Sequence, residues 1–138
     1  MNGHFAIGIH ILSLIALHPE SARSSEYIAA SVGTNAVTIR TVMSLLRKKK
    51  LVKTRQGVAG AALVKAPENL TLLEIYRAVG APESVFNIHD NPHPNCPVGR
   101  HIRTTLSRTF LQAQRALEEE LGSTTLAEVM HDLSSWVQ

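Results

Sequence analysis

The stretch "SSEYIAASVGTNAVTIRTVMSLLRKKKLVKTRQGVAGAALVK", residues 24–65, contains the pattern that decides the fold. Ser24 is a suitable N-cap for a short helix. The sequence "VGTN" breaks that helix at Gly33, because glycine readily adopts the left-handed conformation that ends helices. Thr34 or Asn35 then caps a second helix. Two short helices joined by a tight glycine-containing turn indicate a helix-turn-helix unit, although a generic helical hairpin has the same pattern.

The second helix, expected to reach about Lys49, is amphipathic. Its apolar residues follow the i, i+3, i+4, i+7 spacing of a single buried stripe: Ile39, Val42, Met43 and Leu46. The opposite face is small, hydroxylic and basic, with no acid among Val37, Thr38, Arg40, Thr41, Ser44 and Arg47. Such a face suits contact with a polyanion.

A basic hairpin follows this helix directly. Segments Leu51 to Arg55 and Ala62 to Lys65 are rich in Val, Leu and Thr, and a loop with Gly57 and Gly60 connects them. A helix-turn-helix followed at once by a basic hairpin is a winged-helix arrangement; the alternative is an ordinary surface hairpin. Glycines at the tip allow the main chain to approach phosphates closely.

Charge is strongly segregated along the chain, although the formal net charge is only +3. No acidic residue lies between Glu26 and Glu68, whereas the C-terminal part from Ala116 carries five acids and no Lys or Arg. We therefore expect a cationic face on the N-terminal half that binds double-stranded DNA.

In that complex we expect the second helix to enter the major groove and the wing to lie along the backbone. Arg40 is the best candidate for a bidentate guanine contact and Val37 for contact with a thymine methyl group, whereas the lysines should mostly neutralise phosphates. The predicted DNA-binding residues are Thr34, Asn35, Val37, Thr38, Arg40, Thr41, Arg47, Lys48, Lys50, Lys53, Arg55, Gln56 and Gly57.

The C-terminal half predicts helices around a long connection. Thr71 and Glu74 have capping-box spacing before a helix, a proline-containing loop runs from about Gly80 to Gly99, and a helix of some 33 Å follows from about Arg100 to Leu121. A last helix begins after Thr125, which has capping-box spacing with Glu128, and we expect it to pack on the long helix of its own or a partner subunit. The apolar seam of the long helix is interpreted as a dimer interface: Ile102, Leu106, Phe110, Ala113, Leu117 and Leu121.

The layout resembles the Rrf-two family of bacterial winged-helix transcription regulators. The resemblance is carried by "FAIGIHILSLIAL", the stretch quoted above, "NLTLLEIYRAV" and "NCPVG" ahead of the long helix, and it covers nearly the whole chain. It implies a mainly α fold, a homodimer crossed through the long helix, and a roughly palindromic operator. We therefore expect a winged helix-turn-helix domain over residues 1–80, an effector loop over 81–99 and dimerisation helices over 100–138. The chain departs from the family at Ala36, where proline is usual, and at the wing exit, where Ala61 and Ala62 replace the usual Gly-aromatic pair.

Cluster-binding members of that family hold iron and sulfur through three cysteines in this loop, whereas this chain has only Cys96. One thiolate cannot supply the ligands, so we expect no iron–sulfur cofactor. The spacing of the other donors in the loop matches no standard metal-site pattern, so no residue is assigned as a metal ligand. Three interpretations of the loop stay open. Cys96 is a redox sensor with a lowered pKa, or it has no role beyond packing, or the nearby side chains form a zinc or copper site: His89, Asp90, His93, Cys96 and His101.

Other classes of protein find little support. The apolar run Phe5–Leu17 is shorter than the roughly 20 residues of a membrane span and lacks a basic lead-in, and a single cysteine forms no internal disulfide. We expect a cytoplasmic protein without a membrane segment. No paired carboxylates, nucleophile–base motif or phosphate-binding glycine loop indicates an enzyme. The prediction is a DNA-binding repressor, and the alternative is a winged-helix scaffold for protein contacts with weak or no DNA binding.

Overall fold

A computed structural model describes residues 3–20, 24–54, 60–82, 84–90 and 92–137 of the 138-residue chain. The described part is mainly helical with one small antiparallel sheet, which confirms the predicted fold class. Among these residues, no helix combines the length and the apolar character that a membrane span requires. The elements, in chain order, are α1 (His4–Leu17), α2 (Ser25–Val32), α3 (Ala36–Lys48), β1 (Val52–Thr54), β2 (Ala61–Leu63), the 3-10 helix η1 (Pro67–Asn69), α4 (Leu72–Ala78), α5 (Pro97–Ser123) and α6 (Leu126–Val137).

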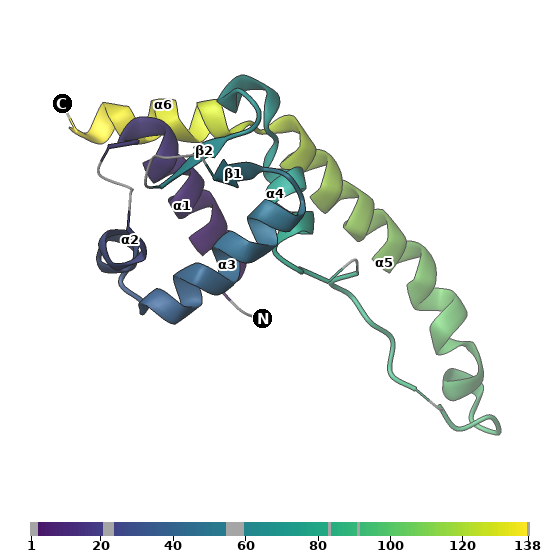
Figure 1. Cartoon of the computed structure of the whole chain (residues 1–138). Coiled ribbons are helices and arrows are strands. Elements are labelled where there is room, and N and C mark those ends of the chain that lie inside the picture. Colours follow the sequence, from purple (N-terminus) through teal and green to yellow (C-terminus); the bar gives the residue numbers. More distant parts are fainter. Residues whose placement is uncertain (1–2, 21–23, 55–59, 83, 91, 138) are drawn as a thin grey trace.

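Helix α1 lies at the centre of the fold (Figure 1). It packs against α2, α3, α4, α6 and β2, which explains why its sequence is apolar on nearly all sides. Ile11 and Leu12 are fully buried. A Cβ added at Gly8 would lie 3.1 Å from a methyl group of Val79, so glycine allows α1 and α4 to pack closely.

The two helices of the predicted helix-turn-helix are α2 and α3. The Ser24 side chain caps α2 by accepting a hydrogen bond from the Tyr27 N–H at 3.1 Å. Gly33 ends the helix with a φ of 84°, in the left-handed region expected of it. Of the two proposed caps for α3, Asn35 is the one used: its Oδ1 accepts the Thr38 N–H at 2.9 Å.

The apolar stripe of α3 faces the core as predicted. Its four members are all buried, and three of them have no exposed surface: Ile39, Val42 and Leu46, with Met43 at 9%. The helix ends at Lys48, and Lys50 adopts a left-handed φ of 61°, the only positive φ outside glycine in the described part. The Leu51 N–H then bonds to the Leu46 carbonyl, and the chain turns directly into β1.

Strands β1 and β2 form the predicted hairpin, with Val52 opposite Leu63 and Thr54 opposite Ala61. Each strand is shorter than the expected segment. Val52 and Ala61 point into the core, and β2 packs against α1. Ala61 is only 6% exposed, which shows that the small residue at the wing exit fills a core position.

The main contacts of helix α6 within its own chain are not with the long helix, which was one of the two predicted alternatives. Helix α6 packs on α1 and η1 of its own chain, and Leu126 is fully buried among core residues. Main-chain bonds fix this position: the Leu126 N–H donates to the Leu70 carbonyl, and Thr71 and Thr125 form an isolated antiparallel bridge. The sequence did not predict this position within the chain, because these pairings join segments that are far apart in the sequence. Packing on the long helix of a partner subunit stays a prediction.

Helix α5 is longer than predicted, beginning at Pro97 rather than near Arg100 and ending at Ser123. Proline suits the first helical turn because its missing N–H would have no partner there. The C-terminal part of α5 packs on α4, whereas its N-terminal part projects away from the core with the segments 84–90 and 92–96 alongside (Figure 1). All six residues of the predicted dimer seam are partly exposed: Ile102, Leu106, Phe110, Ala113, Leu117 and Leu121.

Candidate DNA-binding surface

The exposed side of α3 forms a continuous surface with the base of the wing. Val37, at 67% exposed, stands out near the start of the helix, and Thr41 and Ser44 follow on the same face. The Thr41 hydroxyl donates to the Val37 carbonyl at 3.0 Å. A shallow hollow lined by Val37, Arg40, Thr41, Ser44 and Leu45 marks this face. It offers both apolar and hydroxyl contacts to base edges.

Cationic side chains surround this surface on the wing side. Arg47, Lys48 and Lys50 are exposed at the end of α3, and Lys53 is exposed on β1. None of them forms an ion pair with a described residue. Free surface lysines and arginines of this kind neutralise phosphates when a duplex approaches.

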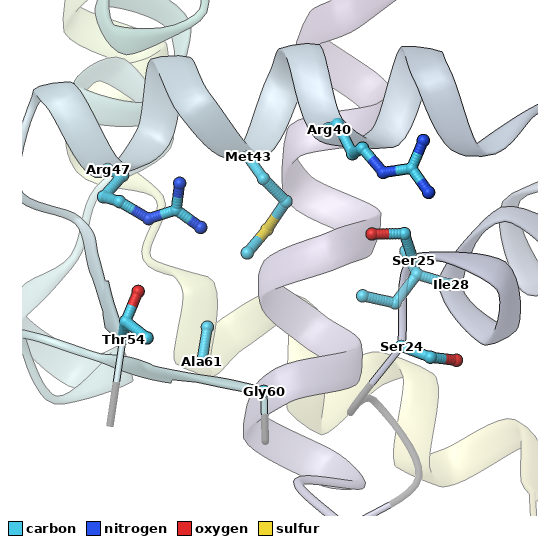
Figure 2. Close-up of a pocket in the computed structure, with 9 residues that line it drawn as sticks. All are labelled: Ser24, Ser25, Ile28, Arg40, Met43, Arg47, Thr54, Gly60 and Ala61. Carbon is cyan, nitrogen blue, oxygen red and sulfur yellow. The ribbon is translucent and has the colours of Figure 1, made fainter. Parts of the chain in front are cut away.

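A second hollow, of about 220 Å³, lies between α2, α3 and the wing (Figure 2). The side chains of Arg40, Met43 and Arg47 extend from α3 toward it. Thr54, Gly60 and Ala61 close it on the wing side. Gly60 has a φ of 96°, so the turn into β2 relies on glycine here.

Arg40 differs from the other cations because it has an acidic partner. Its Nη2 lies 3.2 Å from Oε1 of Glu26, in the first turn of α2, and both side chains are largely exposed at 60% and 71%. The sequence reasoning noted the acid-free interval that begins after Glu26 but did not anticipate this contact. The sequence does carry a signal for this ion pair, because Glu26 is the one acid of the helix-turn-helix segment.

The structure brings most of the predicted DNA-binding residues to one surface. Thr34 and Thr38 are partly exposed, and the others named on α2–α3 and β1 are exposed: Asn35, Val37, Arg40, Thr41, Arg47, Lys48, Lys50 and Lys53. The Oδ1 of Asn35 is already engaged as the N-cap of α3. Arg55, Gln56 and Gly57, predicted at the wing tip, lie outside the described residues.

Cys96 is the N-cap residue of α5 and is exposed. The backbone N–H of Gly99, followed by that of Val98, lowers the pKa of its thiol. The lowered pKa agrees with the predicted direction, and its cause is the N-terminus of α5, to which these two N–H groups belong. The nearby His93 ring is engaged by the main chain, since its Nδ1 accepts the Asn95 N–H at 3.1 Å.

The N-terminal turn of α5 is closely packed at Gly99. A Cβ there would lie 2.5 Å from the His93 carbonyl oxygen, a distance too short for any side chain. The arrangement therefore holds the loop against the first turn of the helix, where Cys96 lies. Among the residues that the structure describes, in the loop and outside it, no three His, Cys, Asp or Glu side chains come together as a metal site would require.

Comparisons with known proteins agree with this geometry. Residues 1–132 match the Rrf2 family model, described as an iron-dependent transcriptional regulator. The chain is 48% identical over 133 residues to YwnA of Bacillus subtilis (strain 168), a candidate HTH-type transcriptional regulator, covering 96% of this chain and 98% of YwnA.

Solved structures show the same fold along nearly the whole chain. A crystal structure of a candidate DNA-binding protein is 45% identical, with a TM-score of 0.74 and coverage of 92% of this chain and 98% of that one. CymR, the global cysteine regulator of B. subtilis, is 25% identical with a TM-score of 0.68 and 95% coverage of each chain. The Rrf-two resemblance is thus confirmed: this chain belongs to the Rrf2 family of DNA-binding transcription regulators.

Proposed function

We propose that this protein is a homodimeric repressor that binds a palindromic DNA operator and has no enzymatic activity. The observation that carries the proposal is the acid-poor surface of α3, with cations on the side of the wing that form no ion pair with a described residue: Arg47, Lys48, Lys50 and Lys53. Because a bacterial operator lies in the cytoplasm, we propose that location as well.

In the proposed complex, α3 lies in the major groove and its first turns read the bases. Val37 is placed for a thymine methyl group, and Arg40 for the O6 and N7 acceptors of guanine. To contact guanine, Arg40 would leave Glu26 and bind the base edge instead. The Glu26 carboxylate and the guanine edge are both hydrogen-bond acceptors for the Arg40 guanidinium. Lys53 and the lysines after α3 contact the backbone and position the helix.

The dimer is proposed from α5. Its 27 residues correspond to a length of about 40 Å, and its N-terminal part extends beyond the core. An isolated subunit leaves the seam from Ile102 to Leu121 partly exposed, and a second α5 would cover it. A two-fold dimer then presents two α3 helices to half-sites about 34 Å apart or a multiple of that distance.

The description of the family names iron, and the donor set of this chain does not fit an iron–sulfur cluster. Cys96 is the single cysteine in the sequence, whereas clusters are held by several thiolates. We therefore propose regulation without such a cluster. A redox response through the lowered pKa of the exposed Cys96 thiol is the supported alternative, because the thiolate is the form that oxidants attack.

Selection of bound sequences from random duplexes by the full chain tests the proposal directly. We expect a palindromic motif and a dimer on each bound duplex, with an affinity that falls steeply as salt rises. Recovery of no enriched motif would refute the repressor assignment.

That negative result would favour a protein-interaction scaffold, for which one observation exists. Leu133 and Trp136 of α6 are 41% and 80% exposed and lie on one side of the helix, three residues apart. Exposed large apolar groups of this kind are common at protein contacts.

A further inference from the structure

The hollow of about 220 Å³ between α2, α3 and the wing has a lining that suits an anion. The buried residues of this lining are apolar: Ile28, Met43 and Ala61. The polar side chains come from three separate elements, with two guanidinium groups on the α3 side and three hydroxyl groups on α2 and β1 across from them (Figure 2): Arg40, Arg47, Ser24, Ser25 and Thr54. No carboxylate is among the described residues that line the hollow.

Arg47 is the cation that the hollow leaves available. Its guanidinium forms no ion pair with a described residue, whereas Arg40 at the other end already lies 3.2 Å from the Glu26 carboxylate. A guanidinium presents five N–H donors in a fixed planar fork, and this fork matches two oxygens of a phosphate with two parallel hydrogen bonds. Arg47 is therefore the natural anchor for an anion in this hollow.

The three hydroxyl groups add neutral donors on the opposite side. The Ser24 Oγ accepts the Tyr27 N–H, which leaves the proton of this hydroxyl for another acceptor. The hydroxyls of Ser25 and Thr54 form no hydrogen bond with a described residue. Ser25 is also the first residue of α2, where the helix carries partial positive charge. Donors that approach from several sides suit a tetrahedral oxyanion better than a planar carboxylate.

The hollow differs from the general cationic surface beside it. Lys48, Lys50 and Lys53 are exposed but do not line the hollow, so they attract an anion without enclosing it. The volume of 220 Å³ is several times the roughly 30 Å³ that one water molecule occupies in the liquid. A phosphate group therefore fits inside together with neighbouring water.

We propose that this hollow binds one phosphate group, held by the guanidinium of Arg47 and by the hydroxyls of Ser25 and Thr54. Two sources share this chemistry: a backbone phosphate of a DNA duplex, and a free phosphorylated small molecule. The site itself is independent of the proposed function, and only the assignment of its phosphate to DNA rests on that function. A phosphate bound here contacts α2, α3 and β1 together, and so joins the wing to the helix-turn-helix.

The test is a titration of the full chain with inorganic phosphate at constant ionic strength, followed by NMR of the backbone amides. The amide signals of Ser25, Thr54 and Ala61 should shift and reach saturation. Sodium chloride at the same ionic strength should not shift them, and malonate, a dianion with planar carboxylates, should bind more weakly than phosphate. Absence of a saturable shift at these amides would overturn the inference.

Variants separate a built site from general attraction. Arg47→Gln should weaken phosphate binding at least about tenfold, as the loss of charged hydrogen bonds predicts. Lys49→Gln removes the same charge from an exposed residue at the end of α3 outside the hollow, and it should leave the affinity for phosphate within about twofold because salt screens it. Equal effects of the two changes would overturn the inference.

Two further changes examine the geometry of the site. Arg47→Lys keeps the charge but loses the planar fork, so phosphate binding should still weaken several-fold. Thr54→Val keeps the shape of an exposed strand residue and removes one neutral donor, which should weaken binding by about twofold to tenfold. Full retention of affinity in both variants would show that charge alone attracts the anion and would refute the built site.

The source of the phosphate is decided with DNA present. If free phosphate displaces the selected operator more than chloride does at equal ionic strength, and Arg47→Lys abolishes this excess, a backbone phosphate occupies the hollow in the complex. If the amides of the hollow still titrate with phosphate while the duplex is bound, the occupant is a free phosphorylated molecule. Phosphate binding by a chain that binds no duplex would refute the proposed function alone. Duplex binding by a chain whose hollow takes no phosphate would refute this inference alone.

Discussion

Replacing Arg40 with alanine separates sequence reading from general attraction to DNA. In the free protein this change removes one ion pair with Glu26 whose members are 60% and 71% exposed. Such an exposed pair contributes between zero and about 1 kcal/mol, so the free energy of unfolding should fall by less than about 1 kcal/mol. Any larger effect of the variant must therefore arise in the complex with DNA.

A bidentate contact to guanine is worth about 1–3 kcal/mol of discrimination. The variant removes this contact at both half-sites of the homodimer, so a loss of about 2–6 kcal/mol in total should weaken binding to the selected operator by about 30-fold to 25,000-fold. Binding to a duplex in which that guanine pair is exchanged should change little, because the wild-type contact is already absent there. Fluorescence anisotropy with both duplexes, at fixed salt, measures the two effects.

Lys53→Ala is the matched control, because this exposed cation lies on β1 and not on the helix that reads bases. It should weaken both duplexes alike and lower the salt slope by about one per subunit. Glu26→Gln completes the set: it frees Arg40 and removes a negative charge beside the DNA, so affinity for every sequence should rise. If Arg40→Ala reproduces the uniform loss of the lysine variant, Arg40 contacts phosphate and the proposed reading of guanine is wrong.

Three further changes test local features. Lys50 has a left-handed φ of 61°, which glycine adopts without strain. Lys50→Gly should therefore raise the free energy of unfolding in urea by about 0.5–1 kcal/mol, while DNA binding weakens. An unchanged midpoint of urea unfolding would contradict the presence of strain at Lys50. Burial alone would raise the pKa of Glu74, but hydrogen bonds from Lys65 and Thr71 lower the pKa overall. A lowered carboxyl pKa stabilises the fold at pH values above the unfolded pKa near 4.5, and this stabilisation is lost as the pH falls through the folded pKa. Acid unfolding below pH 4.5 should therefore be shallower for Glu74→Gln, and parallel curves would argue against the linkage. Alkylation of Cys96 by iodoacetamide should show a midpoint below that of an ordinary thiol, and a midpoint at 9.0 or above would exclude the effect of the helix N-terminus.

Local signals in the sequence were sufficient for the elements of this fold. The capping boxes predicted at Thr71 and Thr125 both form, each with the glutamate three residues later bonding back to the main chain. The buried stripe of α3 depends only on helical periodicity, and the turn at Gly33 on the freedom of one glycine. These features involve residues within a few positions of one another, where sequence spacing translates directly into geometry.

The sequence did not predict the contacts between elements that are far apart in the chain. Helix α6 has a strongly amphipathic pattern, but the pattern says only that one side is buried and not against which element. Its position follows from the main-chain bonds at Leu70 and Leu126, which carry no side-chain signature. The Arg40–Glu26 pair and the Val85–Gln114 bond were also absent from the prediction, since each joins elements whose approach is set by the packed core.

The packing connects α5 to α3 through α4. Helix α5 packs on α4, and α4 packs in turn on both α1 and α3. In the proposed dimer the two α3 helices must match half-sites about 34 Å apart, so a small rotation of α5 against its partner changes the spacing of both. A change in the way the two α5 helices meet would therefore act on DNA binding through the geometry of the dimer, and not by altering α3 itself.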